Sequence, residues 1–476
     1  MPVFFSRRQF LAGLAVGTTT ALDRLLGARA LETSKAQQSL QAFLDHLVES
    51  EKFPGLSLAV AMSGRLVHTV CSGWADPVAR QPVTPRSLFR IASVSKPLTG
   101  LVTARLIEQG SLRPETPVHA YLQLPNPSDS RWRQITVEHC LLHTGGWDRD
   151  KSYDPMFRSR AIAREAGSTT PATPSQIIRH MVGQPLDSNP GSRYAYSNFG
   201  YCLLGRIIEK ATGLPYGRAV QESILRPLGI SSMRLGKTLR DNRAPAEVIY
   251  QDARSRKGRS VFKDGEIVEE PYGAWFLEAM DAHGGWLASA PDLLRWSMVM
   301  DPKAKPALLD TETLAKIQAR PAFTPADAKV WYGWGLQVRQ VNGNKNNLWH
   351  TGSLPGTGAL LVRRHDGLSW ALLANINANP EGKTVAAIAD PALHKAVDQA
   401  SPLDSLDQFG SLGYTPAGCT QKRNPSVSGR GFTRSEMVRF LSPSWEPLRA
   451  SPRQAEADSG CGCCSRSKRN STKRPP

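Results

Sequence analysis

Ser93 and Lys96 are spaced for nucleophilic chemistry. They are the first and last residues of Ser93-Val94-Ser95-Lys96, which opens an apolar segment predicted to be a helix from Ser93 to Gln109. A serine at a helix N-terminus lies at the positive end of the helix dipole, and a lysine one turn later lies on the same face. A partly desolvated lysine has a lowered pKa and can accept the serine proton. The motif therefore predicts a serine nucleophile with a lysine base.

A second motif, Tyr196-Ser197-Asn198, follows the predicted turn Asn189-Pro190-Gly191. A tyrosine next to a lysine can shuttle protons when the cation stabilises its phenolate. The Asn198 side chain offers both a hydrogen-bond donor and an acceptor, which can orient a substrate amide. The alternative is a tyrosine in a surface loop that takes no part in chemistry.

A third motif, His350-Thr351-Gly352, lies on a predicted strand late in the chain and precedes Ser353. Because Gly352 has no Cβ, a substrate acyl chain can approach the strand backbone as an additional strand. We expect His350 and Thr351 to hold an anionic group of the substrate. A second copy, His143-Thr144-Gly145, falls at the end of a predicted helix, where it is interpreted as a structural turn.

Hydrophobic periodicity predicts the elements that position these motifs. A helix is expected over residues 34–50 and a β-hairpin over 56–62 and 65–72, while helical patterns dominate 112–228. Strands return over 333–340, 347–351, 358–364 and 368–375, before a final helix over 391–400. This order predicts an α+β fold with a mostly antiparallel sheet flanked by helices. An all-helical lobe over roughly residues 112–290 is inserted between the sheet segments.

The two ends of the chain are predicted to lie outside this domain. Arg7-Arg8, a mildly apolar stretch over 12–22 and Ala28-Arg29-Ala30 occur in the order of a twin-arginine signal peptide over residues 1–30. This pattern predicts a periplasmic or secreted protein, and the alternative is an N-terminal helix that carries two arginines. Residues 410–476 are basic and rich in Ser, Pro and Gly without periodicity, so a disordered or appended tail is expected there.

Composition argues against several classes of protein. The 476 residues carry a formal net charge of +18, but the basic residues of 31–400 do not cluster with aromatic ones, so nucleic-acid binding is not expected. No apolar run approaches the ~20 residues of a membrane span. The cysteines at 419, 461, 463 and 464 include an adjacent pair that fits zinc spacing poorly, which favours a tail that happens to contain cysteines. No cofactor or metal is expected, and the oligomeric state stays open.

The three motifs, in this order, resemble those of the β-lactamase-related active-site serine hydrolases. This family includes class C β-lactamases, DD-peptidases, D-aminopeptidases and family VIII esterases. The similarity covers residues 33–400, with supporting segments such as Phe89-Arg90-Ile91-Ala92-Ser93 and Gly284-Gly285-Trp286-Leu287. The resemblance implies a sheet and a helical lobe with the site between them.

The resemblance also implies roles for individual residues. Ser93 would form an acyl-enzyme, Lys96 and Tyr196 would move protons, and Asn198 would contact the substrate. The oxyanion hole would consist of the backbone N–H groups of Ser93 and Ser353. The partner would be a small-molecule or peptide acyl substrate, with the irregular segments 147–173 and 248–272 shaping its site.

The motifs leave the substrate open, because D-amino-acid peptides, esters and β-lactams share the chemistry up to the acyl-enzyme. A peptidase or esterase is preferred, a true β-lactamase is the alternative, and a non-catalytic penicillin-binding or sensing module is a third reading. Class C β-lactamases carry lysine at the position of His350. Since histidine is charged only below pH ~6.5, we expect turnover of carboxylate-bearing substrates to weaken above neutral pH.

Overall fold

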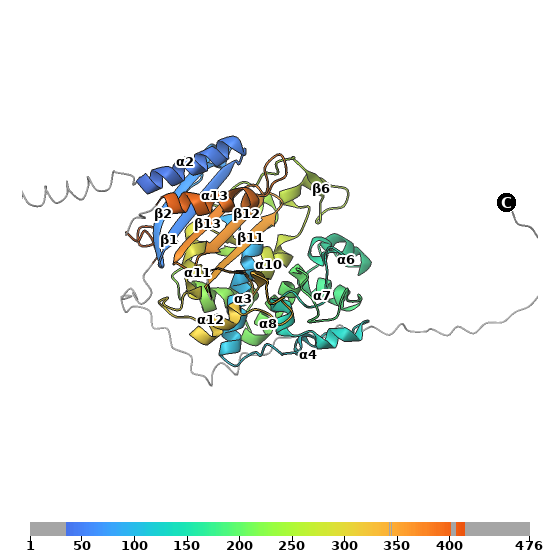
Figure 1. The fold of residues 1–476 in the computed structure, drawn as a ribbon. Helices are drawn as coiled ribbons and strands as arrows, with labels where there is room; N and C mark the ends of the chain where they lie inside the picture. The colour runs from blue at the N-terminus through green and yellow to red at the C-terminus, as the bar shows by residue number, and fades with distance from the viewer. Residues whose placement is uncertain (1–34, 342, 344, 401–405, 415–476) are drawn as a thin grey trace, which may run out of the picture. The chain divides into compact units, whose positions relative to one another are not determined.

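A computed structural model describes residues 35–341, 343, 345–400 and 406–414. Its central element is an eight-stranded sheet with the strand order β3-β2-β1-β13-β12-β11-β10-β9, in which all neighbouring strands are antiparallel (Figure 1). The strands are β1 (Gly55–Met62), β2 (Arg65–Asp76), β3 (Gln81–Pro82), β9 (Val330–Tyr332), β10 (Gln337–Gln340), β11 (Asn346–Leu354), β12 (Thr357–Arg363) and β13 (Leu368–Ala374). The early hairpin therefore pairs with the last strand, and the predicted α+β class with its antiparallel sheet is confirmed.

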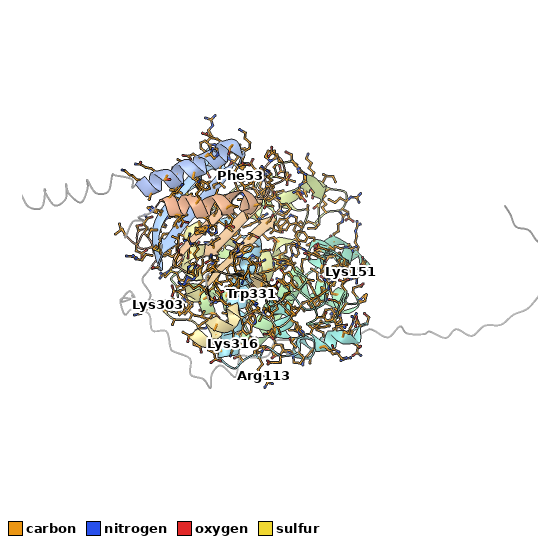
Figure 2. All side chains as sticks on the ribbon, viewed as in Figure 1. Phe53, Arg113, Lys151, Lys303, Lys316 and Trp331 are labelled. Atoms are coloured by element: carbon orange, nitrogen blue, oxygen red, sulfur yellow. The ribbon has the colours of Figure 1, made fainter. Side chains whose placement is uncertain are left out.

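Side chains alternate between the two faces of this sheet, as the period of a strand requires. Along β1, Leu58 belongs to an outer hydrophobic core and Ala59 to an inner one. The outer face is covered by α2 (Lys35–Ser50) and α13 (Val385–Gln399), which lie against each other across the strands (Figure 1). Phe53 extends this outer core at the end of α2 (Figure 2).

The inner face packs against the helical part of the chain in a second, larger core. The helices are α3 (Ser95–Glu108), α4 (Val118–Leu122), α5 (Val137–Leu141), α6 (Ser159–Glu165), α7 (Pro174–Val182), α8 (Asn198–Thr212), α9 (Tyr216–Val220), α10 (Asp281–Gly284), α11 (Ala290–Ser297) and α12 (Thr311–Gln318). Every residue of α3 from Ser95 to Ala104 is buried. A helix that is surrounded on all sides gives the first candidate motif a rigid support.

Short strands connect the two parts. β4 (Phe89–Arg90), β8 (Trp286–Ala288) and β5 (Arg234–Leu235) form a three-stranded sheet in the order β4-β8-β5, and β6 (Lys257–Arg259) pairs with β7 (Ile267–Glu269). β4 is followed closely by the single 3-10 turn η1 (Ala92–Val94), which continues into α3. Ser93 is therefore held where a strand turns into a buried helix.

The last helix begins earlier than the proline in its sequence suggests. It was expected over 391–400 but extends over Val385–Gln399, with Pro391 inside it. The Thr384 side chain accepts a hydrogen bond from the backbone N–H of Ala387 and caps the true start. Pro391 is exposed, so the hydrogen bond that a proline removes is lost on the solvent side, where water can replace it.

The predicted ends of the chain fall largely on residues that the structure does not describe. The signal peptide over 1–30 lies outside them, and so does the predicted tail beyond Tyr414. Residues 406–414, which include the start of that tail, pack on the domain, and the Tyr414 hydroxyl donates to Asp292 Oδ1 at 2.6 Å. Within the described ranges, no helix combines the length and apolarity needed to cross a membrane.

The contact of α13 with the sheet provides a test of the outer core. Leu393 is 0% exposed in this core, whereas Lys395 on the same helix is exposed. We expect Leu393→Ala to reduce the free energy of unfolding by about 2–5 kcal/mol through lost burial and a residual cavity. The matched change Lys395→Ala should shift it by less than about 0.5 kcal/mol. Chemical denaturation of the purified chain measures both, and equal effects would contradict this packing.

Candidate functional site

Ser93 stands at a sharp turn of the backbone. The preceding residue, Ala92, has φ +47°, in the left-handed region that residues with a Cβ rarely adopt. The strain of such a residue is held only where the surrounding structure fixes it. Ser93 is half-buried in η1, so the predicted helix from Ser93 begins as a 3-10 turn before α3 continues it.

Arg90 anchors the backbone just before this turn. Its side chain is completely buried and donates to the carbonyl oxygens of Pro271 at 2.7 Å and Lys237 at 2.8 Å. Its backbone N–H donates to the Tyr250 hydroxyl at 2.8 Å, and its carbonyl accepts from Thr357 Oγ1 at 2.6 Å. The segment 248–272, which was expected to shape the substrate site, thus fixes the strand that leads to Ser93.

Lys96 joins three segments of the chain at one buried amine. Its Nζ lies 3.1 Å from Ser93 Oγ and donates to Asn198 Oδ1 at 2.7 Å and to the His283 carbonyl at 3.1 Å, which leaves the lone pair of the neutral amine for the Ser93 hydroxyl. Burial lowers the pKa of this amine well below its usual value. The Asp154 carboxylate raises the Lys96 pKa in opposition, and the Arg149 guanidinium lowers it further. In its neutral form, which this pKa shift favours, the amine can accept the hydroxyl proton of Ser93, and its role as the base stays a prediction.

Tyr196 completes this cluster, because its side chain is hydrogen-bonded to Ser93. Lys96 Nζ lies 4.7 Å from the centroid of its ring. Burial raises the pKa of Tyr196 well above the usual value, so the phenol keeps its proton. In the free protein, Tyr196 is therefore a proton donor, and its role as a proton shuttle stays a prediction.

Asp154 is the residue that sequence reasoning missed. Its Oδ2 accepts a hydrogen bond from Asn198 Nδ2 at 2.6 Å, and its Oδ1 accepts from the Met156 backbone N–H at 3.0 Å. Asn198 therefore has both ends of its amide engaged inside the protein, with Oδ1 directed at Lys96. These contacts orient the lysine, and the predicted contact of the Asn198 amide with the substrate stays a prediction. The signal was the Asp-Pro pair of residues 154–155 within the long segment 147–173.

His350 does not fulfil the prediction that it holds an anion. It is 4% exposed; its Nε2 lies 3.0 Å from the Tyr332 hydroxyl and its Nδ1 lies 2.6 Å from the Thr351 carbonyl. Burial, with a smaller effect of the Lys96 charge, lowers the pKa of His350 to about 3. The imidazole is neutral at physiological pH, so its titration gives no reason for turnover to weaken above neutral pH.

Thr351 and Gly352 also differ from their predicted roles. Thr351 lies half-buried beside α13, where it lines a cavity of ≈ 320 Å³ together with Ser353, while His350 belongs to the alternate positions of β11. Since neighbouring strand residues point to opposite faces, the side chains of His350 and Thr351 leave β11 on different sides. A Cβ on Gly352 would lie 2.2 Å from the Ile91 carbonyl oxygen, so this glycine allows β11 to approach the turn before Ser93.

The open edge of β11 lies at this point. β10 pairs with β11 only over Asn346–Trp349, so the part of β11 from His350 onward has no partner in β10. η1 lies against β11, which brings the backbone of Ser353 to the neighbourhood of Ser93. The two residues predicted to supply oxyanion donors are thus on adjacent elements.

The second copy of the third motif is a turn, as predicted, but it also supports the site. His143 has φ +58° and is buried, and its Nδ1 accepts from the Ser197 backbone N–H at 3.1 Å. Its ring centroid lies 4.3 Å from that of Tyr196 and 4.4 Å from that of Tyr332. Burial lowers the pKa of His143 well below its usual value, so a neutral aromatic layer backs the Tyr196 ring.

Metal chemistry has no support among the described residues. Within residues 35–341, 343, 345–400 and 406–414, no group of three His, Cys, Asp or Glu side chains is placed to hold a metal ion. The cysteines near the end of the chain lie outside this part.

A serine with a buried lysine and a tyrosine, between an antiparallel sheet and helices, defines an active-site serine hydrolase. The sequence profile of the Beta-lactamase family matches residues 40–394, and the chain belongs to this family. It is 28% identical to esterase EstB of Burkholderia gladioli over 325 residues, which are 65% of this chain and 76% of the esterase. It is 25% identical to a penicillin-binding protein of Bacillus subtilis over 336 residues, 69% of each chain.

A solved structure agrees with this assignment. The D-amino acid amidase of Ochrobactrum anthropi, complexed with L-phenylalanine amide, superimposes with a TM-score of 0.59 at 25% identity. The match covers 77% of this chain and 98% of the amidase. Members of the family thus include an esterase, a penicillin-binding protein and an amidase, so a hydrolase is supported at the level of the family.

Asp154 provides a test of how the lysine is oriented. Asp154→Asn replaces an acceptor with an amide whose NH2 group opposes that of Asn198, which favours a flipped Asn198 with its NH2 against Lys96. We expect kcat/KM to fall about 10- to 100-fold through the misplaced base. Because Asp154 raises the Lys96 pKa, the acidic limb of the pH–rate profile should also move to lower pH.

The exposed carboxylate Asp327 provides the control for this measurement. Asp327→Asn should leave both the rate and the limb in place. An Asp154→Asn protein with a normal melting temperature and an unchanged pH–rate profile would contradict the positioning role of Asp154.

Proposed function

We propose that this protein is an exported serine hydrolase that cleaves an amide or ester through an acyl-enzyme on Ser93. The observation that carries the proposal is the 3.1 Å hydrogen bond between Lys96 Nζ and Ser93 Oγ, made by an amine whose pKa is lowered by burial. A base is effective when its pKa lies near the working pH. The lowered pKa favours the neutral form of Lys96, which is the form that can accept the Ser93 proton.

The proposed acylation uses groups of this chain only. Lys96 takes the proton of Ser93 as Oγ bonds to the substrate carbonyl carbon, and the backbone N–H groups of Ser93 and Ser353 stabilise the oxyanion. Tyr196 donates its proton to the departing amine or alkoxide as the carbonyl re-forms, and the proton on Lys96 then restores the phenol. Water attacks the acyl group in the second step, and Oγ of Ser93 leaves with a proton.

Peptidase and esterase activities are the first candidates for the substrate. The similarity to an amidase and an esterase supports both bond types, and the open edge of β11 suits an extended acyl chain that adds as a strand. A true β-lactamase remains the alternative, because a lactam is also an amide that opens at a serine. A non-catalytic binding module is disfavoured by the intact contacts of Ser93 with Lys96 and Tyr196.

Intact-mass measurements test the nucleophile. The wild-type chain incubated with benzylpenicillin or para-nitrophenyl butyrate should gain the mass of one acyl group, because Ser93 retains it until water attacks. Ser93→Ala should abolish the adduct. Ser95→Ala, a matched change two residues away, should keep it, since Ser95 is buried and makes a structural contact with the Trp286 backbone.

The decay of the adduct separates the substrate classes. A penicilloyl adduct that persists for hours indicates a penicillin-binding peptidase, and one that decays with drug consumption indicates a β-lactamase. An adduct formed equally by the Ser93→Ala protein would contradict the proposal, and so would a wild type that neither acquires an adduct nor hydrolyses any ester, amide or lactam.

Export is proposed from the arginine pair and the apolar stretch within residues 1–30. Replacing Arg7 and Arg8 together by lysine should retain the uncleaved chain in the cytoplasm of a host with a twin-arginine translocase. Arg24→Lys, outside the pair, should leave export unaffected. Cell fractionation with mass analysis of the mature N-terminus gives the result, and an unchanged distribution of the double variant would refute this route.

A further inference from the structure

The site needs another source of positive charge if its substrate is anionic. His350 is neutral and faces Tyr332, as described above. Lys96 must be neutral to act as a base, and its three partners are all groups of the protein. Neither His350 nor Lys96 is therefore available as a cation to bind a carboxylate.

Arg149 supplies a permanent charge beside the same cluster. Its guanidinium carbon lies 4.9 Å from the centroid of the Tyr196 ring, whose hydroxyl is hydrogen-bonded to Ser93. The side chain is 45% exposed, and its ion pair with the exposed Asp150 is long, at 3.9 Å. Its donors are thus accessible from solvent while one face of the guanidinium rests on the aromatic ring.

The charge of Arg149 reaches the reacting groups. It contributes to lowering the pKa of Lys96, His143 and Tyr196, which lie on three different segments around Ser93. A charge felt by these buried groups is also felt by an anion bound beside them, because the protein between them screens less than water.

Neighbouring cations are engaged elsewhere. Arg193 forms an ion pair with Asp148 at 2.6 Å, and Lys151, at the surface near the helical side in Figure 2, donates to the Asp187 carbonyl at 3.1 Å. Arg158 lies over the ring of Tyr153, at 4.6 Å from its centroid. Of these loop cations, Arg149 is the one that lies against a residue of the Ser93 cluster.

We propose that Arg149 binds a carboxylate of the substrate, so that the enzyme prefers acyl compounds carrying a negative charge close to the bond that is cleaved. This inference rests on the proposed function and names its substrate class. The planar guanidinium matches a carboxylate with two parallel hydrogen bonds, and stacking on Tyr196 restrains it in advance, which reduces the ordering cost of binding.

Two matched pairs of chromogenic esters test the proposal. The first pair is mono-para-nitrophenyl adipate and its methyl ester, which place or remove the charge on the acyl side. The second pair is the butanoyl ester of a hydroxy-nitrobenzoic acid and the methyl ester of that compound, which do so on the leaving-group side. For each pair, kcat/KM of the anionic compound is divided by kcat/KM of the neutral one. If a substitution also disturbs Lys96, it changes both values by the same factor, and this factor cancels in the ratio.

Arg149→Gln should lower this ratio about 10- to 100-fold in at least one pair, as expected for loss of a charge-assisted bidentate contact. Arg149→Lys should retain part of the preference for the anionic compound, because lysine keeps the positive charge but lacks the two parallel N–H donors of the guanidinium. Arg158→Gln removes an equal charge from the same loop and should keep both ratios within about twofold of wild type. Ratios that stay unchanged in both pairs for Arg149→Gln would overturn the inference.

Failure of the proposed function gives a different pattern. A wild type that releases no nitrophenol from any of the four esters, gains no acyl adduct and hydrolyses no amide or lactam contradicts the hydrolase proposal and leaves Arg149 to be judged by binding. In that case, calorimetric titration of the Ser93→Ala protein measures how tightly each of the same esters binds. Tighter binding of an anionic ester than its neutral partner, lost in the Ser93→Ala, Arg149→Gln double variant, supports the carboxylate site, and equal binding of both overturns it.

Discussion

A lysine amine without access to water governs the organisation of this protein. Lys96 is 0% exposed, and its Nζ holds together Ser93, the first residue of α8 and the carbonyl of His283 in α10. An isolated charge in such a position would cost several kcal/mol, so the amine loses its proton readily, and all its hydrogen bonds come from fixed partners. The same burial that makes the position costly for a charge makes the amine a base for the neighbouring serine.

The surroundings of this amine are built to keep it in one orientation. Asp154 fixes the amide of Asn198, and that amide presents its oxygen to Lys96. The rings of Tyr196 and His143 lie together on another side and exclude water from the cluster. These groups come from three segments around the residues 143, 154 and 196–198, which explains why a substantial helical part is needed to support so few reacting atoms.

The sequence predicted the parts of the fold that follow from local pattern. It did not predict the roles of residues that depend on contacts with residues far away in the chain. The apolar runs of β1 and β13 and the spacing of Ser93 and Lys96 are local, and the structure has these strands and brings these two side chains together. Asp154 carries no signal beyond its loop, because its function depends on Asn198, which is 44 residues away. The predicted anion contact of His350 failed for the same reason. Whether a histidine on a strand contacts an anion or a tyrosine depends on which face of the sheet is buried.

The pairing of β1 with β13 has a consequence for the synthesis of the chain. The central strands of the sheet come from opposite ends of the domain, and β11, which borders the serine turn, comes from its last part. Contacts between such distant residues form only when the intervening chain is complete. A ribosome-bound chain that stops before Ala374 has its nucleophile and its base but lacks the sheet that holds them, so catalytic competence begins only with nearly the whole domain translated.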